Sequence, residues 1–210
     1  NVAIQENTAY LPLGFMTSPF IAELKSDSPT AGTLTFQNEL FAAATGLQTP
    51  VYTLAEDMHI SSNGIDLSKS GGYCSYSNAQ AGDTVTYSFL VPSDGFVSFS
   101  VSGSKKNSFT VYKNNVELKT ETIGLPQIFA AGDFAQGDLF QVTFELKDGD
   151  SGNLELTAGV LNDKVFQTGL SVLRTSQLEL TSFTDTDIQG TVEVRADGIL
   201  YTSIPYDSNW

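Results

Sequence analysis

Residues 139–147, LFQVTFELK, decide the fold, because apolar and polar side chains alternate strictly along them. The apolar positions are Phe140, Val142, Phe144 and Leu146. Successive side chains of a β-strand point to opposite faces, so these four share one face and the polar residues between them share the other. This pattern is typical of a strand with its apolar face buried in a core.

The same period of two recurs on both sides of this stretch. Three more segments share it: 84–91 (TVTYSFLV), 96–102 (FVSFSVS) and 153–160 (NLELTAGV). In residues 109–119, FTVYKNNVELK, Asn114 and Asn115 tolerate left-handed φ and predict a tight hairpin. Strands separated by turns every 8–12 residues or so are typical of sandwiches and jelly rolls. We therefore predict an all-β antiparallel sandwich, jelly-roll-like, with two short peripheral helices.

The first predicted helix covers residues 34–44, LTFQNELFAAA, in which large apolar side chains recur at helical spacing. Thr33 or Thr35 can cap its start, and Gly46 stands where the chain needs positive φ to end a helix. A strand at 50–56 is predicted to follow.

The second predicted helix covers residues 163–174, DKVFQTGLSVLR, with Asp163 at its start. Gly169 weakens it by about 1 kcal/mol relative to alanine. Three strands are expected after it, at 177–182, 188–195 and 198–204, with a tight turn at Asp197-Gly198 between the last two. Residues 9–16 suit an edge strand, whereas 17–33 and 61–83 are predicted as loops.

The composition excludes several kinds of protein. Asp and Glu number 24 and Lys and Arg 10, so the net charge of -14 disfavours binding to nucleic acid or to an anionic lipid surface. The single cysteine, Cys74, excludes an internal disulfide. No apolar stretch is long enough to span a bilayer, and both ends suggest a piece of a longer chain.

Two parts of the chain contain distinctive sequence motifs. The first is YLPLGFM (10–16) followed by FQNELFAAATG (36–46), and the second is residues 178–210, which end in SIPYDSNW. They resemble the large multi-pass bacterial membrane proteins of the YfhO type, in which "PLG[FY]M" precedes "QN.L…A.TG" and "DG.L..SIPYD.GW" follows later. Asn209 replaces the last glycine. The matching residues are Pro12, Leu13, Gly14, Gln37, Asn38, Pro205, Tyr206, Asp207 and Trp210.

The resemblance implies an extracytoplasmic domain at the cell membrane. It implies one domain, 1–210, with matching flanks (1–60 and 163–210) around a sandwich core (61–162). The flanks are expected to pack together at the end nearest the membrane. The family looks like glycosyltransferases that use lipid-linked sugars and decorate lipoteichoic acid in Gram-positive bacteria. Their chemistry belongs to loops between transmembrane helices, so this chain would be a non-catalytic accessory domain. Its expected partners are the transmembrane portion of the same protein and a cell-wall polymer or glycan.

Catalytic residues are not expected in this chain. His59 is the only histidine, so it has no second histidine to share a metal or a proton relay. Cys74 lacks an evident base nearby in sequence, and no G-x-S-x-G is present. Two alternatives stay open: a free-standing carbohydrate-active hydrolase with a carboxylate pair, and a purely structural or interaction module.

Two kinds of binding site are considered. Exposed aromatic rings stack on sugars, which makes Tyr73 and Tyr76 candidates, with Tyr52, Tyr112 and Tyr201 next. No cofactor is expected, although the DGDSGN turn offers Ca²⁺ the oxygen atoms of Asp148, Asp150 and Asn153. Such residues are also those that any tight turn prefers.

Overall fold

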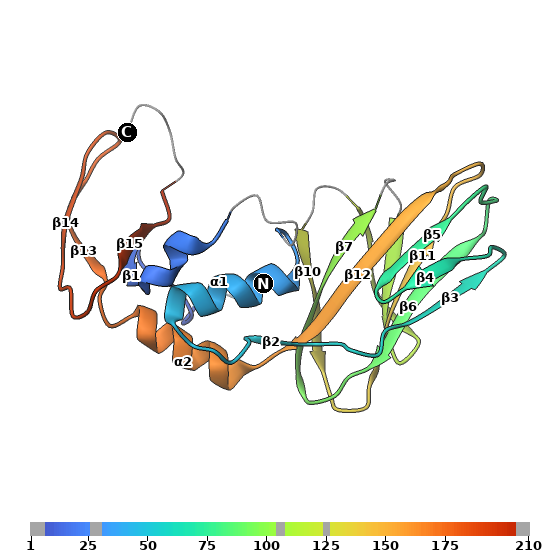
Figure 1. Ribbon diagram of the computed structural model, residues 1–210, viewed down its shortest axis with the longest axis horizontal. Helices are drawn as coiled ribbons and strands as arrows, with labels where there is room; N and C mark the ends of the chain where they lie inside the picture. Colours follow the sequence, from blue (N-terminus) through green and yellow to red (C-terminus); the bar gives the residue numbers. More distant parts are fainter. Residues whose placement is uncertain (1–6, 26–30, 104–107, 124–126, 205–210) are drawn as a thin grey trace, which may run out of the picture. The chain divides into compact units, whose positions relative to one another are not determined.

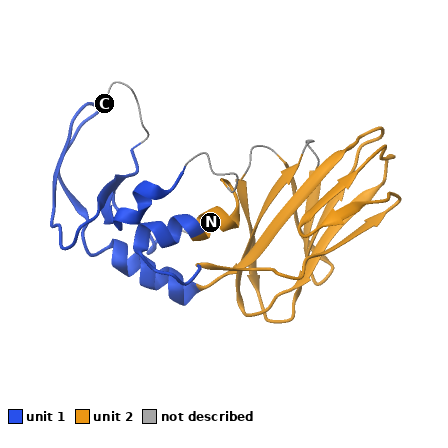
Figure 2. Cartoon of the chain, viewed as in Figure 1, with its two compact units in different colours: residues 1–26, 39–50, 163–210 blue, residues 27–38, 51–162 orange. Residues whose placement is uncertain are grey.

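The computed structural model describes residues 7–25, 31–103, 108–123 and 127–204. The chain divides into two compact units (Figure 2). Unit 1 consists of residues 1–26, 39–50 and 163–210, and unit 2 of residues 27–38 and 51–162. The division passes through helix α1 (Leu34–Thr45).

Unit 2 contains two antiparallel sheets (Figure 1). The six-stranded sheet has the order β10 (Gln127–Phe134), β7 (Gly95–Gly103), β12 (Gly152–Leu161), β5 (Tyr73–Tyr76), β4 (Ser68–Ser70), and β2 (Tyr52–Leu54) also pairs with β12. The five-stranded sheet has the order β3 (His59–Asn63), β6 (Thr84–Leu90), β11 (Leu139–Glu145), β8 (Ser108–Lys113), β9 (Val116–Thr122).

The two sheets enclose one core of aromatic and aliphatic side chains. Phe99 of β7 lies at its centre, with its ring centroid 5.8 Å from that of Phe109, 5.3 Å from that of Phe129 and 5.4 Å from that of Phe140. Phe109 and Phe140 come from the opposite sheet, so these contacts join the two layers. The prediction of an all-β antiparallel sandwich with two short helices is confirmed.

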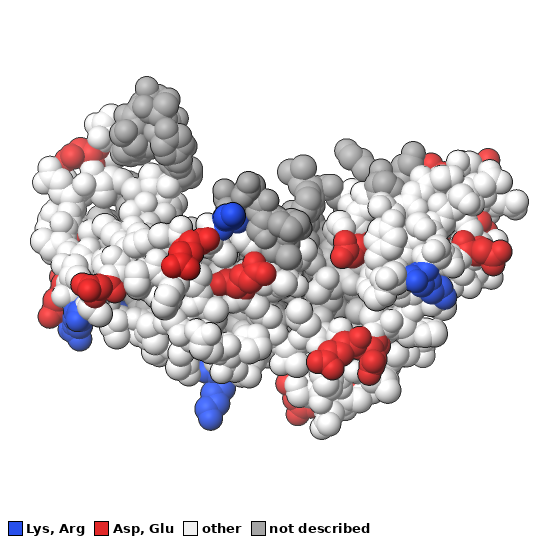
Figure 3. Space-filling view, in the orientation of Figure 1, with Lys and Arg blue, Asp and Glu red and all other residues white. Residues whose placement is uncertain are grey.

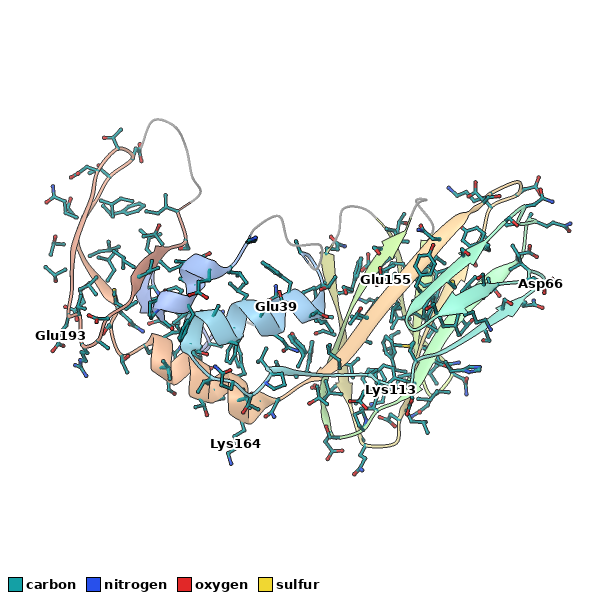
Figure 4. The ribbon with its side chains drawn as sticks, in the orientation of Figure 1. Glu39, Asp66, Lys113, Glu155, Lys164 and Glu193 are labelled. Atoms are coloured by element: carbon teal, nitrogen blue, oxygen red, sulfur yellow. The ribbon has the colours of Figure 1, made fainter. Side chains whose placement is uncertain are left out.

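The Asn114-Asn115 hairpin is confirmed, with φ of 51° and 65° at the two residues. Its turn is tied to the turn before β11 through Asp138. The Asp138 carboxylate accepts hydrogen bonds from Asn114 Nδ2 (2.7 Å) and from the Ala135 backbone N–H (2.8 Å). It also lies 3.0 Å from Nζ of Lys113, which is labelled in Figure 4. These donors lower the pKa of Asp138 to about 2, and the hydrogen bond from the Asn114 amide makes the largest contribution.

Asp138 therefore gives the fold an acid-dependent stability. The pKa of this group is lowered by folding, so its contribution is present above its ordinary pKa of 3.8 and is lost as the pH falls toward 2. We expect the melting-temperature difference between wild type and Asp138→Asn to be constant above about pH 5 and to shrink toward zero near pH 2. Gln136→Ala, which changes an exposed side chain of the same turn, should leave this pH dependence intact.

Helix α1 begins and ends as predicted. The Thr33 hydroxyl accepts from the Phe36 N–H (3.2 Å), and Gly46, with φ of 77°, donates its N–H to the Ala42 carbonyl. Asn38 of this helix pairs with the Tyr52 backbone: Asn38 Nδ2 donates to the carbonyl (2.9 Å), and the Tyr52 N–H donates to Asn38 Oδ1 (2.7 Å). The Asn38 amide thus takes the place of a neighbouring strand on the side of β2 that faces away from β12.

Removing this amide should destabilise unit 2. Asn38→Ala leaves both Tyr52 backbone groups without their partner, and we expect a loss of about 1–2 kcal/mol in the free energy of unfolding. Asn38→Asp should also destabilise, because a carboxylate cannot donate to the carbonyl. Urea unfolding followed by circular dichroism measures both. The neighbouring Gln37→Ala serves as the control and should change stability by less than about 0.5 kcal/mol.

Two sequence predictions within unit 2 were wrong. Residues 61–83 were predicted as a loop, yet they contain most of β3 and all of β4 and β5. β3 and β4 are short and rich in serine, and β5 has only two buried positions, Cys74 and Tyr76, so the apolar alternation that marks a strand is too short to recognise. Strand β10 was not predicted at all, because a bulge between Ala130 and Gly132 breaks its period of two.

Unit 1 joins the beginning and the end of the chain. Strand β1 (Gly14–Thr17) pairs with β15 (Ile199–Thr202), so the first and last strands of the two predicted flanks lie together, whereas β2 and β3 of the first flank pair within unit 2. Phe15, Ala44 and Leu173 form a small core, and the 3₁₀ helix η1 (Pro19–Glu23) follows β1. The matching residues Pro12, Leu13 and Gly14 lead into β1. Pro205, Tyr206, Asp207 and Trp210 lie outside the described residues.

The strands on either side of Asp197-Gly198 pair with other strands and not with each other. Strand β14 (Ile188–Val192) pairs with β13 (Leu178–Phe183), whereas β15 pairs with β1. Gly198 is needed for another reason: a Cβ there would lie 2.3 Å from the Thr17 carbonyl oxygen.

Helix α2 (Asp163–Leu173) also belongs to unit 1, and Gly169 lies in its middle. A Cβ at Gly169 would lie 2.1 Å from Cζ of Phe41, so the glycine lets this ring lie against the helix. The Phe41 ring is stacked on Phe166, at a centroid distance of 6.5 Å. Neither α1 nor α2, nor any other helix in the described ranges, is long and apolar enough to cross a membrane.

Candidate functional site

The outer surface of the five-stranded sheet carries two complete rows of polar side chains. Residues that pair across antiparallel strands point to the same face, so the strand register defines the rows. One row is His59, Ser88, Gln141, Tyr112 and Glu117, and we call it the middle row because it lies between the Leu90–Leu139 pair and the second row. The second row is Ser61, Thr86, Thr143, Thr110 and Thr120. We call these two rows the polar face. Each row spans about 19 Å, from the usual spacing between strands.

The hydroxyl groups of the polar face are partly ordered by one another. The Oγ1 atoms of Thr86 and Thr143 are 2.9 Å apart, and those of Thr110 and Thr120 are 3.0 Å apart. A hydroxyl offers one hydrogen and two lone pairs, so each pair keeps capacity for a further partner. The face therefore presents donors and acceptors in positions that do not have to be rearranged when a ligand binds.

Tyr112 is the aromatic member of the polar face. The register of β8 and β9 shifts between Val111 and Tyr112, which is a bulge in the pair. Bulges change the direction of neighbouring side chains, and here the half-buried Tyr112 ring lies between Gln141 and Glu117.

A hollow of about 540 Å³ adjoins the β3 end of the middle row. We call it the rim pocket. Its lining residues are Thr53, Leu54, Ala55, Glu56, Asp57, His59, Ser88, Phe89, Leu90, Pro92 and Leu139. His59 and Ser88 thus belong both to the pocket and to the middle row. The cross-strand pair Leu90 and Leu139 supplies apolar surface, with Leu90 67% exposed.

The position of the rim pocket follows from the path of the chain. Strand β2 belongs to the six-stranded sheet and β3 to the five-stranded sheet, so residues 55–58 pass from one layer to the other. The Ala55 N–H donates to the Ala158 carbonyl (2.9 Å), which holds the start of this crossing. The crossing segment, with exposed Glu56 and Asp57, forms one wall of the pocket.

The charged side chains of the polar face and rim pocket are carboxylates: Glu56, Asp57 and Glu117. Neither set includes a lysine or an arginine. Three lysines of the described part of unit 2 are engaged elsewhere: Lys113 with Asp138, Lys69 with the Ile60 carbonyl (2.8 Å), and Lys119 over the Phe129 ring. Cationic side chains are also sparse on the surface seen in Figure 3.

Of the aromatic residues singled out from the sequence, Tyr73, Tyr76 and Tyr52 lie on the six-stranded sheet, Tyr112 belongs to the polar face, and Tyr201 lies on β15 of unit 1. Tyr73 is 38% exposed on β5, where it pairs across the strands with Glu155 of β12, which is labelled in Figure 4. The Tyr73 hydroxyl accepts from Asn153 Nδ2 (3.4 Å). Tyr52 is half-buried, with its hydroxyl 3.4 Å from Ser98 Oγ. Tyr76 is only 5% exposed, and this burial removes it from the candidate stacking residues.

The sequence contains a signal for the polar face, namely the polar halves of the alternating strands. Half of any two-layer sheet surface is expected to be polar, so the pattern alone marks no site. Only the register brings Ser88, Gln141 and Tyr112 into one row, together with the histidine of β3.

Cys74 and His59, the candidate nucleophile and the candidate base, are not arranged for covalent catalysis. Cys74 is fully buried, with its Sγ 3.2 Å from the Tyr87 hydroxyl, and burial raises the pKa of the thiol. The Tyr87 hydroxyl donates to the Leu154 carbonyl (3.0 Å), and burial raises its pKa as well. His59 is exposed at the edge strand β3.

The DGDSGN segment forms a turn between β11 and β12. Gly149 has φ of 73° and donates its N–H to the Ala79 carbonyl, and the Asp150 N–H donates to the Lys147 carbonyl. Asn153 is directed at Tyr73, while Asp148 is exposed. Within the described ranges, no group of three or more His, Cys, Asp or Glu residues could hold a metal ion.

Comparison with known proteins gives one match over the whole chain. The family model described as "Bacterial membrane protein YfhO" matches residues 1–210. No curated protein matches the chain.

Several solved structures match about half of the chain. The C-terminal CBM6 of LamC, a marine laminarinase from Zobellia galactanivorans, is 12% identical and covers 50% of this chain and 99% of its own, with a TM-score of 0.33. The low-affinity xylan-binding module CBM86 from Roseburia intestinalis is 14% identical, covering 54% and 96%, with a TM-score of 0.38. CsCBM6-3 from Clostridium stercorarium, in complex with cellobiose, is 15% identical, covering 53% and 93%, with a TM-score of 0.35.

Proposed function

Because the chain belongs to the YfhO family of bacterial membrane proteins, we propose that it is a non-catalytic accessory domain that binds a glycan or cell-wall polymer on the extracytoplasmic side of the membrane. The observation that carries this proposal is the polar face, whose middle row runs directly into the rim pocket.

The chemistry of the polar face suits a sugar chain. Sugar hydroxyls both donate and accept hydrogen bonds, and the rows offer hydroxyl, amide and imidazole groups that do the same. The C–H faces of a sugar ring are apolar and pack against aromatic or aliphatic surface, which Tyr112, Leu90 and Leu139 supply. A sugar unit in the rim pocket would anchor a chain that extends across the strands toward Tyr112.

The partner that we propose for unit 1 is the membrane-embedded part of the same protein. Unit 1 exposes large apolar side chains that its own core does not cover: Tyr10, Phe20, Leu180, Phe183, Val194, Leu200 and Tyr201. A surface of this kind supports contact with another apolar surface. In this proposal the sandwich holds a sugar-bearing polymer, such as lipoteichoic acid of a Gram-positive cell wall, through its sugar units, for glycosyl transfer by the membrane-embedded part.

The geometry favours binding over hydrolysis. Glycoside hydrolysis requires two carboxyl groups in different environments, one of them kept protonated by apolar surroundings. Glu56 and Asp57 of the rim pocket are both exposed to solvent. They are suited to hydrogen-bonding a ligand rather than to acting as a matched acid and base.

Titration with soluble polysaccharides tests the proposal. Wild type should bind at least one member of a panel of glucans, galactans, xylan and polyglycerol phosphate in affinity electrophoresis and calorimetry. The double variant Tyr112→Ala with Gln141→Ala should weaken that binding by about 30-fold, as expected for loss of about 2 kcal/mol at a central contact.

Tyr73→Ala is the matched control, because it removes an exposed tyrosine from the other sheet. It should change the affinity less than about 2-fold. Loss of binding in Tyr73→Ala but not in the double variant would assign the site to the six-stranded sheet. A wild-type chain that binds no member of the panel would contradict the proposed function.

A further inference from the structure

We infer that the polar face and rim pocket take uncharged sugar units rather than the phosphate backbone of a polymer. This inference rests on the proposed glycan-binding function and names the ligand class of that site. It starts from the charges at the two ends of the middle row.

The middle row has carboxylates at both ends. Glu117 lies at the β9 edge, and Glu56 and Asp57 line the pocket at the β3 edge. An anionic chain laid along the row would meet like charge at each end, and the net charge of -14 adds a long-range repulsion. An uncharged chain meets neither effect.

The row also lacks the groups that proteins use to bind phosphate. Phosphate is usually held by arginine or lysine, or by backbone N–H groups at a helix start. The side chains between the two ends are His59, Ser88, Gln141 and Tyr112. The last three lie on inner strands that are paired with a neighbour on each side, and His59 lies on the edge strand β3. These side chains match sugar hydroxyls in charge and in hydrogen-bonding capacity.

The apolar part of the site points to the same ligand class. Leu90 and Leu139 stand opposite each other in the row next to His59 and Ser88, and Pro92 lines the same hollow. A sugar ring can place an apolar C–H face on these side chains while its hydroxyls reach Ser88 and Gln141. A phosphodiester has no comparable apolar face.

Binding of two kinds of probe at two salt concentrations tests the inference. The first kind is a set of neutral polysaccharides (dextran, galactan and xylan), and the second is polyglycerol phosphate without sugar substituents. Between about 0.01 M and about 1 M NaCl the Debye length falls from about 30 Å to about 3 Å, so only charge-dependent binding should respond strongly. We expect a neutral probe to bind with an affinity that changes less than about 2-fold, and polyglycerol phosphate not to bind at low salt.

A charge-reversed variant sharpens the test. Glu56→Lys with Asp57→Lys should give the chain a measurable affinity for polyglycerol phosphate at low salt, and this affinity should disappear at high salt. Circular dichroism confirms that the variant is folded.

The outcomes separate this inference from the function on which it rests. Wild type that binds polyglycerol phosphate at least as tightly as every neutral probe, with binding weakened by salt, overturns the inference and leaves polymer binding intact. Wild type that binds neither kind of probe overturns both.

Discussion

Replacing Phe99 by alanine is expected to lower the free energy of unfolding by about 3–5 kcal/mol. The side chain is completely buried, and its ring contacts phenylalanine rings of both sheets. Truncation removes this apolar area from the core and leaves a cavity that the surrounding strands fill only in part. Urea unfolding of wild type and Phe99→Ala, followed by far-ultraviolet circular dichroism, measures the loss.

Phe183→Ala is the control for this measurement. It makes the same chemical change at a side chain that is 64% exposed, so the stability should change by less than about 0.5 kcal/mol. A loss below about 1 kcal/mol in Phe99→Ala would mean that the contacts through this ring do not hold the two sheets together.

The second large effect on stability is expected for Gly169→Ala, and its sign is opposite to the one that helix propensity alone predicts. Alanine stabilises a helix by about 1 kcal/mol relative to glycine. At this position its methyl group would overlap the Phe41 ring, whose three nearest atoms would lie 2.1–2.9 Å from the new Cβ. The ring is held by its stacking on Phe166, so we expect Gly169→Ala to destabilise unit 1 by about 2–3 kcal/mol.

Two further variants identify the cause. Thr168→Ala changes an exposed residue of the same helix and should be neutral or slightly stabilising. Combining Gly169→Ala with Phe41→Leu should restore part of the lost stability, because the smaller side chain makes room for the methyl group. A stabilised Gly169→Ala variant would show that the ring moves aside without cost.

The sequence predicted the fold best where one face of a strand is buried. Strands β6, β7, β11 and β12 have large side chains alternating with small polar ones, and each was predicted at nearly its observed position. The prediction failed where register or geometry departs from that rule, at the bulged strand β10 and at the short polar strands β4 and β5. Their positions are determined by the neighbours to which they hydrogen-bond, which local sequence does not specify.

The candidate site could not be predicted from the sequence for a related reason. The sequence offers His59 as a candidate for catalysis and Tyr112 as one of several candidate stacking rings, and nothing along the chain connects the two. In the structure they belong to one row because β3 pairs with β6, β6 with β11 and β11 with β8. A binding surface built across strands depends on pairings between residues up to 57 positions apart, such as Thr86 and Thr143.

The β1–β15 pairing has a consequence for the order of folding during synthesis. Thr17 Oγ1 donates to the Ile199 carbonyl, 182 residues later, so this pair of strands can form only after β15 has left the ribosome. By then residues 51–162 have emerged, and their folding places the Asn162 N–H 2.8 Å from the Val51 carbonyl. Folding of residues 51–162 thus brings the two ends of this segment together. Strand β15 can then pair with β1 without the full entropy cost of closing a long flexible loop.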